Sequence, residues 1–514
     1  MSTTFNRLLS GSILRTISLV ITIIISFFMM PFIVHSIGDK WYGLWVLVGS
    51  LMGYYMVVDF GLLSATQRYL ARYLYEKEML NKVINTAFCV LCLLSVVAAF
   101  FVVVFLYVTP YLVNDSEVVT TMRWLIIILG AKTVLTLPLM VFNGMLSAKL
   151  RFDLASYIEI SKNILRSILI VVYLTFDYGI VSLALITFIC EMCAFVAISL
   201  FAVNIYPEAN YGKKYFDKVF AKELFKFGKF TFVIETSNLL KSKVDDFVIA
   251  KMLGLSFVTT YAIAFSLFTY AGQMVSNLLG GVMTVFSQND KQGVDVLRQN
   301  FLLFAEVCVT LVTFISVFMF LVGEEFILLW MGEDYHQSFD VLVVFIATML
   351  FGSSARATIP LFYATATHKK IAYWNIYEGV LNLCLSIYLT MNFGLIGVAL
   401  GTFFSSIVFR LLQVSYACSI VELNRWSYWE MIIKHWLYGI SMLYILYEIS
   451  SLFEINSYVN ILITCILGTL IYVFILTRYM LSLELKKVLS KNLAGKIPSK
   501  LLFFFFNYTT VSES

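Results

Sequence analysis

The stretch that decides the fold is FKFGKFTFVIETSNLLKSKVDDFVIAKMLG, residues Phe225 to Gly254. It has the length of a membrane-spanning helix but carries charged residues well inside it, among them Glu235, Lys241, Lys243, Asp245 and Asp246. The opening of the chain, GSILRTISLVITIIISFFMMPFIVHSIG from Gly11 to Gly38, has the same skeleton: a glycine near a basic end, a long spanning stretch and a final apolar–Gly pair. This similarity predicts that a second copy of one fold begins near residue 224, and that two like halves face a shared interior.

The composition indicates a polytopic membrane protein. Of the 514 residues, 61% are hydrophobic and 13% are charged, and the mean hydropathy is +0.89. This balance excludes a water-soluble domain of such size. The first apolar stretch, Ile13 to Val34, is long enough to span and no small-residue cleavage site follows it. We therefore expect it to be the first helix of an all-α membrane fold, not a cleaved signal peptide.

Fourteen hydrophobic runs have spanning length, and each is predicted to be a transmembrane helix. They cover residues 11–34, 42–66, 84–109, 120–146, 154–176, 179–205, 225–254, 258–286, 297–322, 338–363, 372–392, 394–420, 431–452 and 457–478. Lys and Arg collect on alternate loops, in the segments 68–82, 149–151, 213–222 and 486–500, whereas the opposite loops hold little beyond Lys40, Arg123 and Lys251. Positive charge gathers on the cytoplasmic side, so both termini are predicted to be cytoplasmic.

Three further pairs of segments match in order, which strengthens the repeat. The pairs are Thr136-Leu-Pro138-Leu139 with Thr358-Ile-Pro360-Leu361, Glu159 and Asn163 with Glu378 and Asn382, and Asp177-Tyr-Gly179-Ile180 with Asn392-Phe-Gly394-Leu395. Chance similarity is the alternative. A six-helix unit gives parallel repeats, as in transporters whose substrate passes between two halves by alternating access. Pro138 and Pro360 are candidate hinges, because proline removes a helix hydrogen bond.

The repeat predicts how the chain is divided. We expect an N-terminal six-helix lobe over 1–205, a cytoplasmic linker over 206–222 and a C-terminal six-helix lobe over 223–420. Two more transmembrane helices follow in 421–480, and a cytoplasmic tail covers 481–514.

Several short motifs resemble a known family. They are Gly38-Asp-Lys-Trp-Tyr42-Gly43-Leu44-Trp45, Asp59-Phe-Gly61-Leu62 with Arg68-Tyr69-Leu70-Ala71, Val244-Asp245-Asp246 before Leu253-Gly254, Leu329-Trp330-Met-Gly332, and Phe393-Gly394-Leu395-Ile396-Gly397-Val398-Ala399. Across roughly residues 10 to 420, the chain resembles the polysaccharide-exporter (O-antigen flippase-like) branch of the multidrug/oligosaccharidyl-lipid/polysaccharide superfamily.

The resemblance implies two V-shaped lobes like those of the superfamily's multidrug (MATE) branch. It also implies transfer of a polyprenyl-pyrophosphate-linked oligosaccharide, such as an O-antigen repeat unit for lipopolysaccharide, across the bacterial inner membrane. The implied partners are that substrate, membrane lipids, and a polysaccharide polymerase with its chain-length machinery.

Cationic residues at membrane depth are the candidates for binding an anionic head group, because a buried charge normally faces a bundle interior or a wet cavity. In the run 154–176, Glu159, Lys162 and Arg166 share a narrow stripe with excess positive charge, which suits a diphosphate. The alternative is a Glu–Lys pair that locks this helix to a neighbour. Lys132 lies about a dozen residues from either end of its helix and should face the lumen.

The first helix carries one cation. Arg15, Thr22 and Ser26 share a face that should line the cavity, although Arg15 could instead snorkel to the nearby cytoplasmic surface. The remaining substrate-binding candidates are Lys241, Arg356 and Arg410.

Carboxylates within the spans are candidates for ion coupling. They are Asp59, Glu159, Glu191, Glu235, Asp245 and Glu378. On the charged helix, Lys241 with Asp245 and Lys243 with Asp246 have the spacing of intrahelical ion pairs, and such pairing is the alternative to a coupling role.

Other chemistries lack support in the sequence. The Cys89/Cys92 and Cys190/Cys193 spacings lie in apolar runs without a nearby histidine, so we interpret them as packing residues. Without a phosphate-binding loop, ATP is not the direct energy source, and we expect no cofactor, metal or nucleic-acid partner and no enzymatic activity. The alternatives to a glycan flippase are a drug/cation antiporter or peptidoglycan-precursor flippase of the same superfamily, and a glycan polymerase or ligase. The last should have a large outer loop, whereas residues 323–340 are short and acidic.

Overall fold

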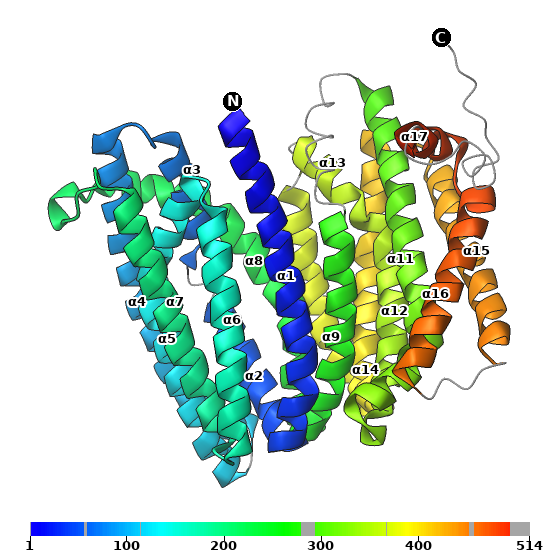
Figure 1. The fold of residues 1–514 in the computed structure, drawn as a ribbon, viewed down its shortest axis with the longest axis horizontal. Coiled ribbons are helices and arrows are strands. Elements are labelled where there is room, and N and C mark those ends of the chain that lie inside the picture. Colours follow the sequence, from blue (N-terminus) through cyan, green and yellow to red (C-terminus); the bar gives the residue numbers. More distant parts are fainter. Residues whose placement is uncertain are drawn as a thin grey trace. The chain divides into compact units, whose positions relative to one another are not determined.

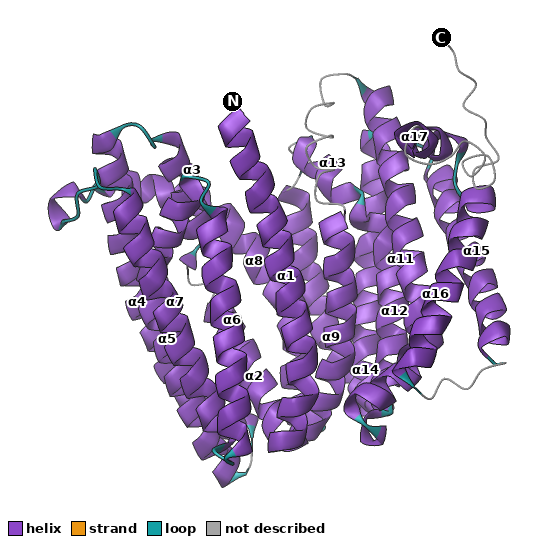
Figure 2. Cartoon of the chain, in the orientation of Figure 1, coloured by secondary structure: helices purple, strands orange, loops and turns teal. Residues whose placement is uncertain are grey.

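The computed structural model describes residues 2–55, 59–113, 115–278, 293–365, 367, 369–451 and 457–493. In those residues the regular elements are helices and none is a strand, as Figure 2 shows. The predicted all-α class is confirmed. Most of the predicted tail, from residue 494 onward, lies outside the described residues.

Nine helices in the described part of the chain are long and apolar enough to cross a membrane. They cover Leu14–Ile37, Lys77–Leu112, Ser116–Ala148, Gly179–Ile205, Leu255–Asn277, Val294–Met331, Gln337–Ala364, Lys370–Ile420 and Tyr458–Met480. Backbone N–H and C=O groups cannot hydrogen-bond to water inside the hydrocarbon layer. Apolar segments of this length must therefore satisfy these groups within the segment, as a helix does. The chain is an integral membrane protein, and the count of fourteen spans stays a prediction.

Contacts divide the chain into two compact units, Met1–Ala262 and Ile263–Ser514. The first contains α1 (Ser2–Ile37), α2 (Asp39–Tyr55), α3 (Leu62–Arg72), α4 (Lys77–Leu112), α5 (Ser116–Ala148), α6 (Phe152–Thr175), α7 (Gly179–Ile205), η2 (Lys213–Tyr215), α8 (Lys218–Met252) and the start of α9 (Leu255–Leu278) (Figure 1). The lobe boundaries expected from the sequence remain predictions.

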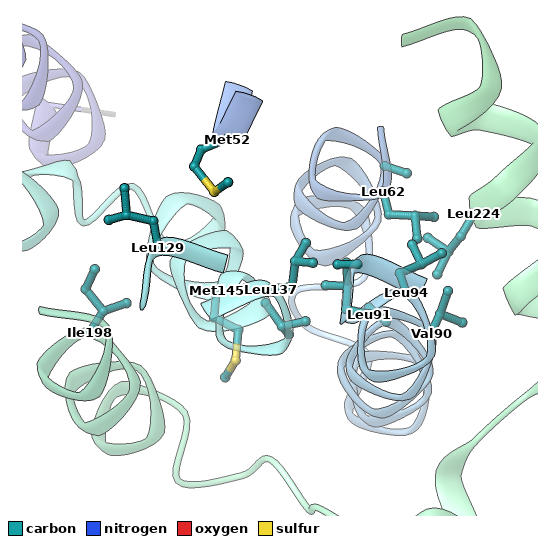
Figure 3. Packing of buried hydrophobic residues seen from close by; sticks show 14 of the residues in the cluster. Met52, Leu62, Val90, Leu91, Leu94, Leu129, Leu137, Met145, Ile198 and Leu224 are labelled. Carbon is teal, nitrogen blue, oxygen red and sulfur yellow. The ribbon is translucent and has the colours of Figure 1, made fainter. Parts of the chain in front are cut away.

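The core of the first unit forms where α4, α5 and α7 pack side by side. Figure 3 shows Leu91, Leu129 and Ile198 in this cluster, together with Leu224 from α8. Burial of these large apolar side chains provides close packing between helices, which must replace the hydrophobic effect as the source of association inside a lipid bilayer.

The charged helix α8 packs on α2, α3 and α4 of the first unit. Gly228 makes this possible, because a Cβ at that position would collide with the backbone carbonyl of Phe60. The Phe60 ring then stacks on Phe232 at a centroid distance of 4.5 Å. The segment 59–61 is a sharp turn, with φ of 51° at Phe60 and 68° at Gly61. A small residue therefore decides how closely α8 approaches the turn between α2 and α3.

The connector between α7 and α8 is held against α4 by buried polar side chains. Asn85 donates to the carbonyl of Asn210 at 2.8 Å and accepts from the amide of Gly212 at 2.8 Å. One turn earlier, Asn81 accepts from the amide of Asn210 at 2.8 Å. The predicted linker is thus tied to the first unit by side-chain–backbone hydrogen bonds.

The second unit is built around the long helix α11 (Val294–Met331), which contacts α12 (Gln337–Arg356), α15 (Arg425–Ser450) and α16 (Tyr458–Ile475). Its other elements are the end of α9, η4 (Glu333–Tyr335), α13 (Thr358–Ala364), α14 (Lys369–Ile420), the π-helical turn η5 (Leu476–Met480) and α17 (Leu483–Leu493). Buried Phe301, Phe362 and Tyr428 lie in one of its apolar clusters.

Glycines that match in the sequence repeat share an unusual backbone. Gly38 and Gly254 have φ of 82° and 110°, and Gly179 and Gly394 have φ of 65° and 57°. L-residues with a side chain rarely adopt positive φ. Glycine therefore allows these helix ends and the kink in α14 to form without the steric strain that a Cβ would add.

Candidate functional site

The first cluster of charges lies between α6 and α7. The Nζ of Lys162 donates to Oε2 of Glu159 at 2.9 Å and lies 3.3 Å from Oε2 of Glu191 on α7. The Lys162 side chain is 9% exposed, whereas those of Glu159 and Glu191 are 48% and 22% exposed. The i, i+3 spacing on α6 brings the first pair together, and helix packing supplies the second carboxylate.

Two further cations complete this cluster. Lys132 of α5 is half-buried and lies within electrostatic range of Glu191, Lys162 and Arg166. The Nε of Arg166 is buried and has no hydrogen-bond partner within the described residues. Three cations thus face two carboxylates. An unpaired buried donor beside excess positive charge is an arrangement that an anionic ligand would satisfy.

The face of α1 predicted to line a cavity packs on α6. The buried Asn163 donates to the Thr22 hydroxyl at 3.0 Å, and that hydroxyl donates to the Ser18 carbonyl at 2.8 Å. The Arg15 guanidinium lies over the Phe152 ring, 4.5 Å from its centroid, and its side chain is exposed. Arg15 is therefore placed by a cation–π contact near the start of α6.

A second cluster, in the second unit, contains the predicted residues Glu378, Arg410 and Arg356. The buried carboxylate of Glu378 accepts from Nη2 of Arg410 at 3.0 Å, and Nη1 of Arg410 donates to Gln413 at 2.7 Å. Arg356 is within electrostatic range of Arg410 and donates to the Ser276 hydroxyl at 3.3 Å. Here two guanidinium groups face one carboxylate, which again leaves positive charge in excess.

The acidic residues of α8 make a separate set of contacts with α2 and α9. Asp245 accepts from the Tyr261 hydroxyl at 2.6 Å, and Asp246 accepts from the Ser50 hydroxyl at 2.5 Å. Both aspartates are buried, and Lys243 lies within electrostatic range of Asp246. The ion-coupling prediction names Asp245 and omits its neighbour Asp246. Both are buried and accept a hydrogen bond from a hydroxyl, so the structure makes Asp246 an equal candidate. Its partner Ser50 is distant in sequence, and no pattern in the sequence indicates that contact.

The other predicted residues on α8 and before α3 are placed differently. Lys241 is half-buried on α8, and Glu235 is exposed. Asp59 accepts from the amide of Gly61 at 2.7 Å, and Glu235 lies within its electrostatic range. Asp59 thus stabilises the turn that Gly228 contacts, which is a structural role alongside the predicted coupling role.

Besides Asp246, another buried carboxylate is absent from the residues predicted from the sequence. Glu306 of α11 is 4% exposed and accepts from both the amide and the hydroxyl of Ser482 at 2.6 Å. Nε2 of the buried His435 lies 4.0 Å from it. A lone acid within the hydrophobic run 297–322 was the available indication. Its partners come from distant segments, so the sequence could not identify them.

The two predicted hinge prolines occupy different settings. Pro138 lies inside the continuous helix α5, whereas Pro360 lies in the first turn of α13, just after α12 ends at Arg356. Proline is tolerated in a first turn, because amides there have no intrahelical partner. A hinge at either residue remains a prediction.

Residues 42–340 match the family described as polysaccharide biosynthesis protein. The chain belongs to this family. The chain is also similar to a Shigella flexneri protein named as an O-antigen transporter, 23% identical over 406 residues that cover 76% of this chain and 94% of that protein. A Haloferax volcanii protein named as the low-salt glycan biosynthesis flippase Agl15 is 22% identical, over 54% of this chain and 58% of its own length.

Solved structures share the fold of this family member. The lipid II flippase MurJ in an inward closed conformation has a TM-score of 0.73 and 15% identity, and the alignment covers 95% of this chain and 100% of MurJ. An inward-facing multidrug resistance transporter of the MATE family, in the MOP superfamily, has a TM-score of 0.68 and 14% identity, covering 80% and 98%. The MOP-type fold implied by the sequence resemblance is confirmed.

Proposed function

We propose that the chain is a flippase for a polyprenyl-pyrophosphate-linked oligosaccharide, and that it works by alternating access in the bacterial inner membrane. Membership of the polysaccharide biosynthesis family and the names of the two relatives support a glycan lipid as cargo. The observation that carries the proposal is the cluster of Lys132, Lys162 and Arg166, which holds excess positive charge and an unpaired Arg166 Nε at membrane depth.

The cluster suits a pyrophosphate for a physical reason. A buried cation costs free energy unless it is paired, so without cargo Lys162 is held by two carboxylates. An arriving pyrophosphate would satisfy the Nε of Arg166 and the ammonium of Lys132 with charge-assisted hydrogen bonds. Glu159 and Glu191 would stay near Lys162 while the cargo is bound. They can therefore compete for its ammonium, which allows the site to release the cargo again.

Ion coupling is the second part of the proposal. Glu378, which pairs with Arg410, and Asp245, which accepts from Tyr261, are buried carboxylates in the two units. Protonation or cation binding at such a group would change its partner and thereby bias a two-state transition. We propose that one of them takes up the coupling ion. The other predicted acids remain candidates for the same role.

We further propose fourteen spans in two parallel six-helix repeats, with both termini cytoplasmic. Helix α14 has 52 residues, which is about 78 Å of helix against roughly 30 Å of hydrocarbon. Its kink at Gly394 supports two crossings, and the matching positive φ of Gly179 supports the repeat. A polymerase and chain-length machinery on the outer side would be the partners that use the product.

A drug/cation antiporter of the same superfamily is the competing function, and the MATE fold similarity is compatible with it. A cationic drug would require a site in which carboxylates outnumber cations. Cations outnumber carboxylates in both clusters, which favours an anionic cargo.

A reconstituted flipping assay tests the proposal. Proteoliposomes containing the full chain and a fluorescent short-chain polyprenyl-pyrophosphoryl sugar should show protein-dependent transfer between leaflets. Lys132→Met and Arg166→Met should each reduce transfer at limiting cargo by about 10- to 100-fold, because each removes a charge-assisted hydrogen bond of roughly 1.5–3 kcal/mol. Arg123→Gln is the matched control, since Arg123 lies on α5 and donates to Thr109 outside the cluster. Transfer by both cluster variants at the wild-type rate would refute the cation site.

A further inference from the structure

A polar pocket of ≈ 340 Å³ lies at the end of the first unit where α1 ends. Three chain turns meet there, and the lining includes Ser36, Trp41, Glu117, Thr121, Asp177 and Tyr178. By contrast, a cavity of ≈ 460 Å³ between α2, α4 and α8 is lined by apolar and aromatic side chains, as expected of a lipid-facing recess. The polar pocket is therefore chemically different from its surroundings in a membrane protein.

The fold holds the walls of this pocket in place. Asp177 has a φ of 59° and Gly179 of 65°, so the turn between α6 and α7 takes a left-handed path. The Tyr178 ring rests beside the Tyr173 ring at a centroid distance of 5.3 Å. The turn and the ring contact hold Tyr178 in place before a ligand arrives, so binding need not order this side chain.

The opposite wall is fixed by an ion pair. Lys40 donates to Asp115 at 2.6 Å and lies 5.6 Å from the centroid of the Trp41 ring. Asp115 in turn caps α5 by accepting from the amide of Glu117 at 3.0 Å. The pair therefore links the start of α2, which carries Trp41, to the first two turns of α5, which carry Glu117 and Thr121.

The chemistry of the lining fits a sugar. The apolar C–H face of a pyranose packs on an aromatic ring such as Trp41 or Tyr178, because aromatic side chains combine a flat apolar body with a polar tip. Ring hydroxyls can donate to the carboxylates of Glu117 and Asp177, which accept several hydrogen bonds each. Neither side-chain carboxylate has a hydrogen-bond or ion-pair partner among the residues that the structure describes.

Charge and size narrow the ligand further. Two carboxylates with one cation nearby, itself engaged by Asp115, disfavour a pyrophosphate or an acidic sugar. The volume lies at the lower end of the range of about 300–1,000 Å³ for small-molecule sites, which admits one or two sugar units but not a long glycan. A neutral saccharide is the ligand class that satisfies both conditions.

We propose that this pocket binds a neutral saccharide unit of the cargo. The inference rests on the proposed function and on the proposed topology, in which this end of α1 faces the outer side. There the pocket would hold the glycan after its head group has crossed, while the cationic cluster that binds pyrophosphate lies deeper in the same unit.

Saturation-transfer NMR on the full chain in nanodiscs tests the pocket. The probes are free D-glucose, D-galactose, N-acetyl-D-glucosamine and L-rhamnose, with D-glucuronate as the anionic comparison. At least one neutral sugar should show transfer to its ring protons, and its affinity should fall about five-fold in Tyr178→Ala, equivalent to roughly 1 kcal/mol for one aromatic contact. Asp177→Asn should also weaken binding, since asparagine tolerates the left-handed backbone but lacks the charge.

The controls separate this inference from the flippase proposal. Tyr178 is 64% exposed, so its truncation should not unfold the protein, and Tyr107→Ala removes a comparably exposed tyrosine of α4 outside the pocket. Equal sugar signals in wild type, Tyr178→Ala and Asp177→Asn, or preferential binding of glucuronate, would overturn the saccharide site. Sugar binding that depends on Tyr178, in a protein that does not flip the labelled cargo, would support the site and reject the proposed function.

Discussion

The shared cation Lys162 offers a sharp test of how the charged cluster is held together. Lys162→Met keeps most of the aliphatic volume but removes the ammonium that lies 2.9 Å from Glu159 and 3.3 Å from Glu191. The variant therefore leaves two carboxylates facing one another across α6 and α7. Breaking a fully buried pair costs about 3–5 kcal/mol, whereas a surface pair contributes about 0–1 kcal/mol.

The exposures of the three side chains set the expected magnitude between these limits. Lys162 is 9% exposed, but Glu191 is 22% and Glu159 is 48% exposed, so water screens part of the repulsion. We expect Lys162→Met to lower the free energy of unfolding by about 2 kcal/mol. Adding Glu191→Gln to that variant should restore about 1 kcal/mol, because it removes one unpaired carboxylate.

Unfolding by SDS in mixed micelles measures these differences, with flipping kinetics as a second readout. The matched control is Lys434→Met, which removes an exposed i, i+4 pair at 2.7 Å from Glu430 and should leave stability close to that of wild type, because water screens a surface pair. Glu191→Gln alone frees Lys162 for the cargo, so it should lower the cargo concentration needed for half-maximal flipping. Equal stability losses in Lys162→Met and Lys434→Met, or no recovery in the double variant, would refute the reasoning.

Three other predictions follow from contacts elsewhere. Gly228→Ala places a methyl group against the backbone carbonyl of the turn before α3 and should cost about 1–3 kcal/mol in SDS unfolding, whereas Gly49→Ala, in open space, should not. Glu306→Gln keeps the shape of a buried acid but cannot accept both hydrogen bonds from Ser482, the residue before α17. Limited proteolysis should therefore cut near residues 482–493 faster than in wild type. The Lys40 ammonium lowers the pKa of the Asp115 carboxyl, so the pair stabilises the folded state above the ordinary aspartate pKa of about 4 and loses this contribution as pH falls through the lowered value. Thermal stability should therefore fall more on acidification from about pH 5 to about pH 3 in wild type than in Asp115→Asn.

Each of these has a contrary outcome. Equal unfolding of the two glycine variants would mean that α8 does not approach the turn closely. Wild-type protease resistance in Glu306→Gln would mean that the carboxylate does not hold α17. Parallel acid sensitivity of wild type and Asp115→Asn would mean that Lys40 and Asp115 do not interact in solution.

Local pattern was enough to anticipate several parts of the candidate site. The stripe of Glu159, Lys162 and Arg166 follows from helical periodicity, because residues three and four apart share a face. Lys132 was recognisable from its distance to both helix ends alone. The glycines of the repeat were visible in the sequence, and the positive φ of Gly179 and Gly394 gives their physical reason.

Contacts between distant helices were not available from such patterns. The sequence suggested that Lys162 pairs within its helix, and packing added Glu191 from α7. Packing also joined Arg410 to Glu378, Ser50 to Asp246 and Ser482 to Glu306. Periodicity reports which residues share a face but not which helix that face meets, and helix association in lipid depends on shape and polar partners more than on hydrophobicity.

The sequence by itself determined that this chain is an all-α membrane protein, because long apolar segments enter hydrocarbon only as structures that hydrogen-bond their own backbone. The tertiary structure alone decided which charges are paired, and that the Nε of Arg166 is buried without a hydrogen-bond partner in the described part of the chain. It also decided that three turns distant in the chain form one polar pocket. Both depend on how helix faces pack, and that is set by side-chain fit between segments, which composition and spacing do not encode.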